Sequence, residues 1–83
     1  MDIVIIDAKR LTEKTSAHEY LKKLFSFPDY YGKNLDALYD CLSERVGTLV
    51  IVQNSEAGGY APRVIGVLDE SAADGTISLK KIV

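Results

Sequence analysis

The sequence predicts an α/β fold, a small three-stranded parallel sheet packed with three to four helices. Short apolar, β-branched segments alternate with longer segments in which apolar residues recur at helical spacing, and turn-forming residues separate them. Strands that are separated by helices favour a parallel sheet with right-handed crossovers. The chain has 83 residues, so we expect a single domain over residues 1–83, because a chain of this length is too short for two hydrophobic cores.

The first strand and the first helix are expected in the N-terminal third. Residues 3–6 (IVII) are apolar at successive positions, which is typical of a strand buried on both faces. Residues 16–19 (SAHE) fit a capping box, so a helix is expected to begin at Ser16 and to end before Pro28. Its inward face would contain Ala17, Tyr20, Leu21 and Leu24, with His18, Lys22 and Lys23 outward.

A second helix is expected after the loop 26–33, in which Gly32 is a candidate for a positive φ. Asn34 is a good N-cap, and an acid in the first turn complements the helix dipole. The buried stripe would consist of Leu35, Leu38, Leu42 and Val46. On the opposite side three acids recur one turn apart, namely Asp36, Asp40 and Glu44.

The C-terminal part is expected to add two strands and one helix. Residues 48–52 (TLVIV) predict a second buried strand. Pro62 is acceptable in the first turn of a helix that runs to about Asp74. Its inward residues would be Ala61, Val64, Ile65, Leu68 and Ala72. Residues 76–83 (TISLKKIV) predict a weaker third strand, so the order is strand, helix, helix, strand, helix, strand.

Composition limits the classes of function and location. The net charge is −2, and basic residues are scattered without interleaved aromatic residues, which argues against direct nucleic-acid binding and favours a basic protein partner. No apolar run approaches the roughly 20 residues that span a bilayer. The N-terminus lacks the features of a secretory signal, and the single Cys41 has no second thiol, so we expect a cytoplasmic protein.

Enzymatic chemistry is not expected. His18 and Cys41 are predicted on different helices with no third group to orient them, and no phosphate-binding glycine loop is present. Carboxylates on a solvated helix face form a poor acid–base pair, because general acid catalysis requires a pKa raised by burial. They also offer a metal ion oxygen ligands from one side only. We therefore expect no catalysis, no cofactor and no metal site.

The acidic face of the second helix has two interpretations. It can be an ordinary solvated helix side, or a surface that docks on a cationic protein. The acids have no basic partners four residues away, and Tyr30, Tyr31 and Tyr39 lie beside them, as in interfaces with aromatic anchors. Packing in the core is an alternative for one or two of these tyrosines.

Residues 27–44 (FPDYYGKNLDALYDCLSE) resemble the central segment of the barstar family, which comprises intracellular inhibitors of the secreted ribonuclease barnase, and the element order fits that family over residues 1–83. The resemblance implies a barstar-like fold and a monomeric inhibitor that plugs the active site of a basic, guanyl-type ribonuclease with its second helix and preceding loop. Asp40 would replace a substrate phosphate, and Asp36 would pair with a second basic group. The remaining contacts would come from Tyr30 in the cleft, Tyr39 at the family's tryptophan position, Asn34, Gly32, Glu44 and, by counting back from Gly75, Glu70.

The chain also departs from the family pattern. Glu44 and Arg45 stand where the family has a small residue and a tryptophan, so the end of the plug differs. Residues 53–62 (QNSEAGGYAP) replace a short helix in a region that is several residues shorter. The alternative function is therefore a barstar-fold binding module for another basic protein, such as a different toxin nuclease or a regulator.

Overall fold

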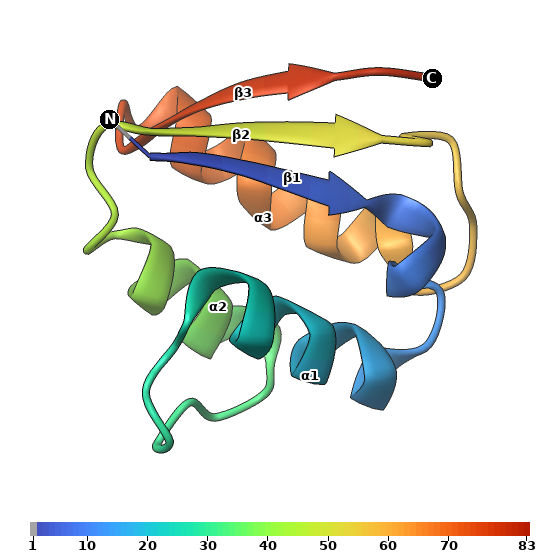
Figure 1. The fold of residues 1–83 in the computed structure, drawn as a ribbon, viewed down its shortest axis with the longest axis horizontal. Coiled ribbons are helices and arrows are strands. Elements are labelled where there is room, and N and C mark those ends of the chain that lie inside the picture. Colours follow the sequence, from blue (N-terminus) through green and yellow to red (C-terminus); the bar gives the residue numbers. More distant parts are fainter. Residues whose placement is uncertain (1) are drawn as a thin grey trace.

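The computed structural model describes residues 2–83 and has the predicted α/β architecture (Figure 1). In chain order, its elements are β1 (Ile3–Asp7), the 3-10 helix η1 (Ala8–Leu11), α1 (Lys14–Phe25), α2 (Leu35–Leu42), β2 (Thr48–Gln53), α3 (Ala61–Ala73) and β3 (Ile77–Lys81). The three-stranded parallel sheet and the three α-helices confirm the predicted fold class. Among residues 2–83, no helix combines the length and apolar character needed to cross a membrane.

The sheet has the order β1-β2-β3, and both strand pairs are parallel. Ile5 pairs with Ile51, which in turn pairs with Lys80. Because sequential strands joined by crossovers of one hand place every connection on the same side, the helices gather on one face of the sheet (Figure 1).

The open face of the sheet corrects the prediction for the first strand. Ile6 is fully buried beneath the helices, but Ile3 is 59% exposed and Ile5 is 50% exposed. The expectation that residues 3–6 are buried on both faces is wrong, because no helix covers the outer face. In β2 the same alternation leaves Val50 and Val52 buried and Leu49 and Ile51 half-buried.

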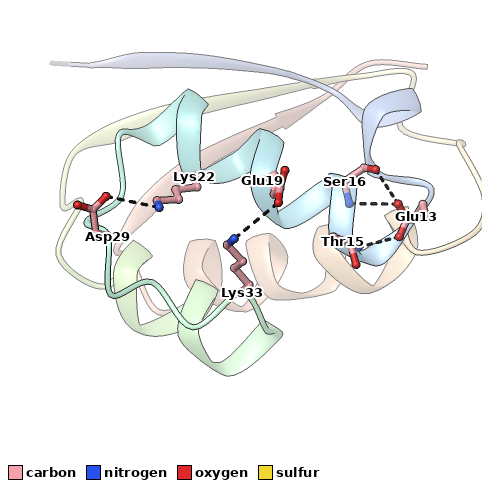
Figure 2. A network of polar contacts seen from close by, with 7 residues as sticks. All are labelled: Glu13, Thr15, Ser16, Glu19, Lys22, Asp29 and Lys33. Atoms are coloured by element: carbon pink, nitrogen blue, oxygen red, sulfur yellow. Dashed lines mark hydrogen bonds and ion pairs between the residues drawn. The ribbon is translucent and has the colours of Figure 1, made fainter.

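Helix α1 begins two residues earlier than predicted. The Glu13 carboxylate caps it by accepting hydrogen bonds from the backbone N–H groups of Thr15 (2.9 Å) and Ser16 (3.2 Å) and from the Ser16 hydroxyl (2.6 Å) (Figure 2). The predicted capping box at Ser16 is therefore wrong, because Glu13 is the N-cap and Ser16 already lies in the first turn of the helix. The helix ends at Phe25, and Ser26 adopts the left-handed conformation with φ +56°.

His18 is fully buried, which contradicts its predicted outward position. Its Nδ1 lies 2.6 Å from the hydroxyl of Tyr31, and its Nε2 lies 2.7 Å from the hydroxyl of Tyr60. The loop after α1 and the residue before α3 cover this side of the helix. Two distant hydroxyl groups therefore make burial of the imidazole possible, because each ring nitrogen has a partner.

Helix α2 is shorter than predicted, because it ends at Leu42 with Ser43 as its C-cap. Val46 is 78% exposed, so its assignment to the buried stripe is wrong. Gly32 does not have a positive φ; besides Ser26, the left-handed residue of this loop is Lys33, with φ +53°. Helix α3 follows the prediction closely, with Pro62 in its first turn.

The core lies between the sheet and the helices. Helix α3 packs against β3 and α2, while α1 packs against η1 and β1. The largest side chains that are fully or almost fully buried are Phe25, Ile6, Leu11, Leu21, Leu38, Leu42 and Leu68. This packing fixes α2 on the edge of the helical layer, so one side of α2 is covered and the other is available to a partner.

Candidate protein-binding site

The start of α2 is fixed by Asn34, as predicted. Its Oδ1 accepts a hydrogen bond from the backbone N–H of Ala37 (2.7 Å), and its Nδ2 donates to the carbonyl of Gly32 (3.2 Å). The same side chain thus caps the helix and ties the preceding loop to it. Both Gly32 and Asn34 are exposed, so they remain accessible at the end of α2.

The three predicted acids are all exposed, but they do not all lie on the helix. Asp36 and Asp40 are one turn apart on α2. Glu44 lies beyond the C-terminus of the helix, where its N–H donates to the carbonyl of Cys41 (3.3 Å). Burial raises the pKa of the Cys41 thiol, and the negative charges of Glu44 and Asp40 raise it further. Both carboxylates therefore lie close to Cys41.

Tyr39 connects the acids of α2 with the end of α3. It is half-buried, and its hydroxyl donates a hydrogen bond to the carboxylate of Asp74. This bond, together with the charge of Asp74, burial and the charges of Glu70 and Asp40, raises the pKa of the Tyr39 hydroxyl. Glu70 and Asp74 thus extend the acidic surface onto α3. Sequence reasoning included Glu70 and missed Asp74, whose only signal is an acid directly before the turn at Gly75.

The two neighbouring tyrosines of the loop have opposite environments. Tyr30 is 82% exposed, whereas Tyr31 is 5% exposed. The ring of Tyr31 packs against Phe27, with 4.8 Å between ring centroids, and its hydroxyl bonds to His18. Of the alternatives left open by the sequence, core packing holds for Tyr31, and Tyr30 keeps an exposed aromatic ring in the loop before α2.

The acids of this surface have no ion-pair partner among residues 2–83. The ion pairs within that range involve Lys22 with Asp29, Lys33 with Glu19, and Lys81 with Asp69. None includes an acid from the set Asp36, Asp40, Glu44, Glu70 and Asp74, which we call the acidic surface. Lys14 and Arg63 line a shallow hollow together with Asp36, so positive charge borders the acidic surface at Asp36.

The departure from the family pattern at residues 44 and 45 affects the acidic surface through Glu44. Arg45 folds back onto α1, where its guanidinium group lies 5.8 Å from the ring centroids of Phe25 and Phe27 and donates to the carbonyl of Phe25. This carbonyl belongs to the last turn of α1, where acceptors lack helical partners. Arg45 therefore stabilises the fold and, within residues 2–83, forms no ion pair with these acids, although its charge opposes theirs at Cys41.

The described residues offer no arrangement for the enzymatic alternative. Both ring nitrogens of His18 bond to tyrosine hydroxyls, and burial raises the pKa of Cys41, which disfavours a reactive thiolate. Within residues 2–83, no group of three or more His, Cys, Asp or Glu side chains could hold a metal ion. What the surface provides is a set of exposed carboxylates with an aromatic border.

Comparison with known proteins decides the family. The family described as Barstar (barnase inhibitor) matches residues 1–72. This chain belongs to the barstar family. It is also similar to the candidate ribonuclease inhibitor YrdF of Bacillus subtilis (strain 168). The two sequences are 38% identical over an alignment of 87 positions, which covers 96% of each chain. Barstar family members are inhibitors and not enzymes, so family membership confirms the prediction that the chain is not an enzyme.

Proposed function

We propose that this barstar family member inhibits a basic, guanyl-type ribonuclease by placing α2 and the loop 27–34 in the enzyme's active site. The observation that carries the proposal is the acidic surface, whose carboxylates have no ion-pair partner among residues 2–83. Unpaired surface carboxylates attract a cationic protein surface, which speeds association and selects the partner. The ribonuclease name of the relative and the family description support the same class of partner.

Individual residues are assigned roles on this surface. Asp40 is exposed on α2 and is the proposed substitute for a substrate phosphate among the basic residues of the enzyme. Asp36, one turn earlier, pairs with a second basic group. Tyr30 contributes the exposed ring, which offers a large contact area with few rotatable bonds.

The remaining residues frame these contacts. Asn34 and Gly32 present the loop next to the helix N-terminus, and Tyr39 packs between α2 and Asp74. Glu44, beyond the end of α2, and Glu70, on α3, add further negative charge. In this proposal the protein acts in the cytoplasm as a single-domain monomer, needs no cofactor and performs no reaction of its own.

Competition with a nucleotide tests occupation of the phosphate site. The purified protein is added to a guanyl-type ribonuclease that holds guanosine 3′-monophosphate, and displacement of the nucleotide is measured. We expect stoichiometric displacement by the wild type and by Glu56→Ala, an exposed acid outside the acidic surface. Binding without displacement would contradict the plug mechanism. No binding to the ribonuclease would instead favour a module for another basic protein.

A further inference from the structure

The loop 27–34 carries the exposed Tyr30 but has neither helix nor strand to hold it. Its fixed points are buried side chains. Phe27 stacks on Phe25 of α1, with ring centroids 5.1 Å apart, and Tyr31 enters the core beside it. The backbone N–H of Tyr31 donates to the carbonyl of Pro28 (2.9 Å). This hydrogen bond closes a turn that leaves the side chain of Tyr30 exposed. The position of Tyr30 therefore depends on how firmly Tyr31 is held.

Three side chains from distant parts of the sequence form a buried hydrogen-bond chain, which we call the histidine network. His18 on α1 lies at its centre, with Tyr31 of the loop at Nδ1 (2.6 Å) and Tyr60 before α3 at Nε2 (2.7 Å). Both tyrosine rings also contact the imidazole, with ring centroids 5.8 and 5.4 Å away. The network thus joins the loop to two helices through one residue.

The hydrogen-bonding capacity of these groups determines the tautomer of His18. Tyr31 is 5% exposed, so its hydroxyl hydrogen needs an acceptor inside the protein, and the nearby Nδ1 provides it. Nε2 then carries the ring hydrogen and donates to the oxygen of Tyr60, which is only half-buried and can donate its own hydrogen to water. In this arrangement every donor has an acceptor.

Protonation of His18 would disrupt the chain at its loop end. Nδ1–H would become a donor, so the hydroxyl of Tyr31 would have to turn its hydrogen away into the core, where an unpaired donor is costly. The surroundings also disfavour the imidazolium. Burial and the positive charge of Lys14 lower the pKa of His18. The groups that face it from other elements are the neutral hydroxyls of Tyr31 and Tyr60; behind these lie the Cys41 thiol of α2 and Arg63 of α3.

The geometry points to His18 as a positioning residue that holds the loop 27–34 in its ribonuclease-binding conformation through Tyr31 and Tyr60. This inference rests on the proposed function, and it deepens it by making affinity depend on a buried residue that contacts no partner. Since the bound loop requires a neutral imidazole, affinity is full above the pKa of His18 and falls as the pH decreases through it.

Removal of single hydroxyl groups separates positioning from general stability. Tyr31→Phe keeps the ring but deletes the bond to His18. Tyr20→Phe is the matched control, because the Tyr20 hydroxyl of α1 accepts from the backbone N–H of Asp7 (3.0 Å) and holds β1 instead of the loop. Affinity for a guanyl-type ribonuclease is measured where urea titrations show every variant to be folded. We expect Tyr31→Phe to weaken binding about tenfold and Tyr20→Phe to leave it within about twofold. Equal effects would overturn the inference.

A pH series provides the readout that a purely structural role would not move. The ratio of wild-type affinity to His18→Gln affinity is measured from about pH 7.5 down to below the midpoint of the wild-type His18 NMR titration, so that His18 is fully titrated and titration of the enzyme cancels. We expect the ratio to fall toward acid pH. A ratio that does not change with pH would overturn the inference.

A measurement without the ribonuclease distinguishes failure of this inference from failure of the proposed function. His18 is the single histidine of the chain, so its ring protons give an unambiguous NMR titration. We expect Tyr31→Phe to change that titration and to accelerate hydrogen exchange at the N–H of Tyr31, both more than Tyr20→Phe does. If the wild type fails to bind the enzyme while these changes occur, the proposed function is wrong and the positioning of the loop stands. Equal NMR behaviour of the two variants would contradict the positioning itself.

Discussion

The α1 side of the molecule and the α2 side differ in whether their charged side chains form ion pairs. On the α1 side two lysines are paired with acids, since Lys22 Nζ lies 3.5 Å from Asp29 and Lys33 Nζ lies 3.6 Å from Glu19 (Figure 2). On the α2 side, the carboxylates of the acidic surface form no ion pair within residues 2–83.

In the proposed function, the side with unpaired carboxylates is the one that faces the partner. A net charge of −2 suggests little electrostatic steering, but the separation of charge between the two sides creates a local negative field that the total conceals. Acids that are paired with lysines are not repelled in the free protein, so they gain little from a cationic partner. Uncompensated neighbouring acids repel one another, so their arrangement is more favourable once a cationic surface is present.

The largest expected effect compares one acid from each side. Asp40→Ala should weaken ribonuclease binding by about 2–5 kcal/mol, because it leaves basic groups of the enzyme buried without a partner. This range draws partly on the barnase–barstar pair and is therefore not independent of the family. Glu19→Ala changes the net charge by the same amount but should weaken ribonuclease binding by less than about 0.5 kcal/mol. Titration calorimetry measures both, and similar losses would remove the distinction between the two sides.

The second prediction concerns the loop that brings Tyr60 to the histidine network. Gly59 has φ +64°, and a Cβ there would lie 2.3 Å from the carbonyl oxygen of Thr12. Gly59→Ala should therefore lower the free energy of unfolding by about 3 kcal/mol. Gly66→Ala is the control, because its Cβ would meet no atom within 4 Å and alanine favours a helix, so a gain of about 0.5–1 kcal/mol is expected. Urea unfolding measures the free energy of unfolding of both variants. A change in the same direction for both would contradict this account.

A smaller effect is expected at Ser71 in α3. Its hydroxyl is buried and, among the described residues, has no hydrogen-bond partner. Ser71→Ala should raise the free energy of unfolding by about 1 kcal/mol, because it removes an unsatisfied polar group and adds a stronger helix former. Ser43→Ala provides the contrast, since the Ser43 hydroxyl donates to the carbonyl of Asp40 (2.5 Å). Thermal unfolding measures the stability of both variants. A more stable Ser43→Ala together with a less stable Ser71→Ala would contradict this prediction.

The smallest effect is expected for an ion pair of the α1 side. Lys22→Ala removes the partner of the exposed Asp29 and should change stability by less than about 0.5 kcal/mol, because exposed ion pairs are screened by solvent and salt. Chemical unfolding at low and high salt checks this. A loss above 1 kcal/mol that disappears in salt would mean that the paired charges hold the fold more strongly than argued.

Local patterns predicted the elements whose signals lie within a few residues. Asn34 caps α2 with its own side chain, and Pro62 occupies the first turn of α3, so the starts of both helices could be predicted from the sequence. The start of α1 was misplaced because Glu13, a less usual capping residue, caps the N–H groups of Thr15 and Ser16 and so begins the helix before the expected cap. Val46 was misplaced because α2 ends before the apolar spacing does.

The tertiary features were not predictable from periodicity. His18 occupies a position that α1 alone would leave polar, and its burial depends on Tyr60, which is 42 residues away. Asp74 reaches the acidic surface because α3 packs beside α2 and Tyr39 bridges them. The open face that exposes Ile3 and Ile5 follows from strand order, which residues 3–6 do not encode. Each of these features arises from contacts between distant segments.

The most direct test of the role of the acidic surface is inhibition of a basic, guanyl-type ribonuclease as it cleaves RNA. The wild-type protein is titrated into the enzyme at low and at high salt, beside Asp40→Ala. Our account predicts stoichiometric inhibition that weakens as salt screens the carboxylates and that collapses in the variant. Inhibition that is equally strong in Asp40→Ala and unaffected by salt would contradict it.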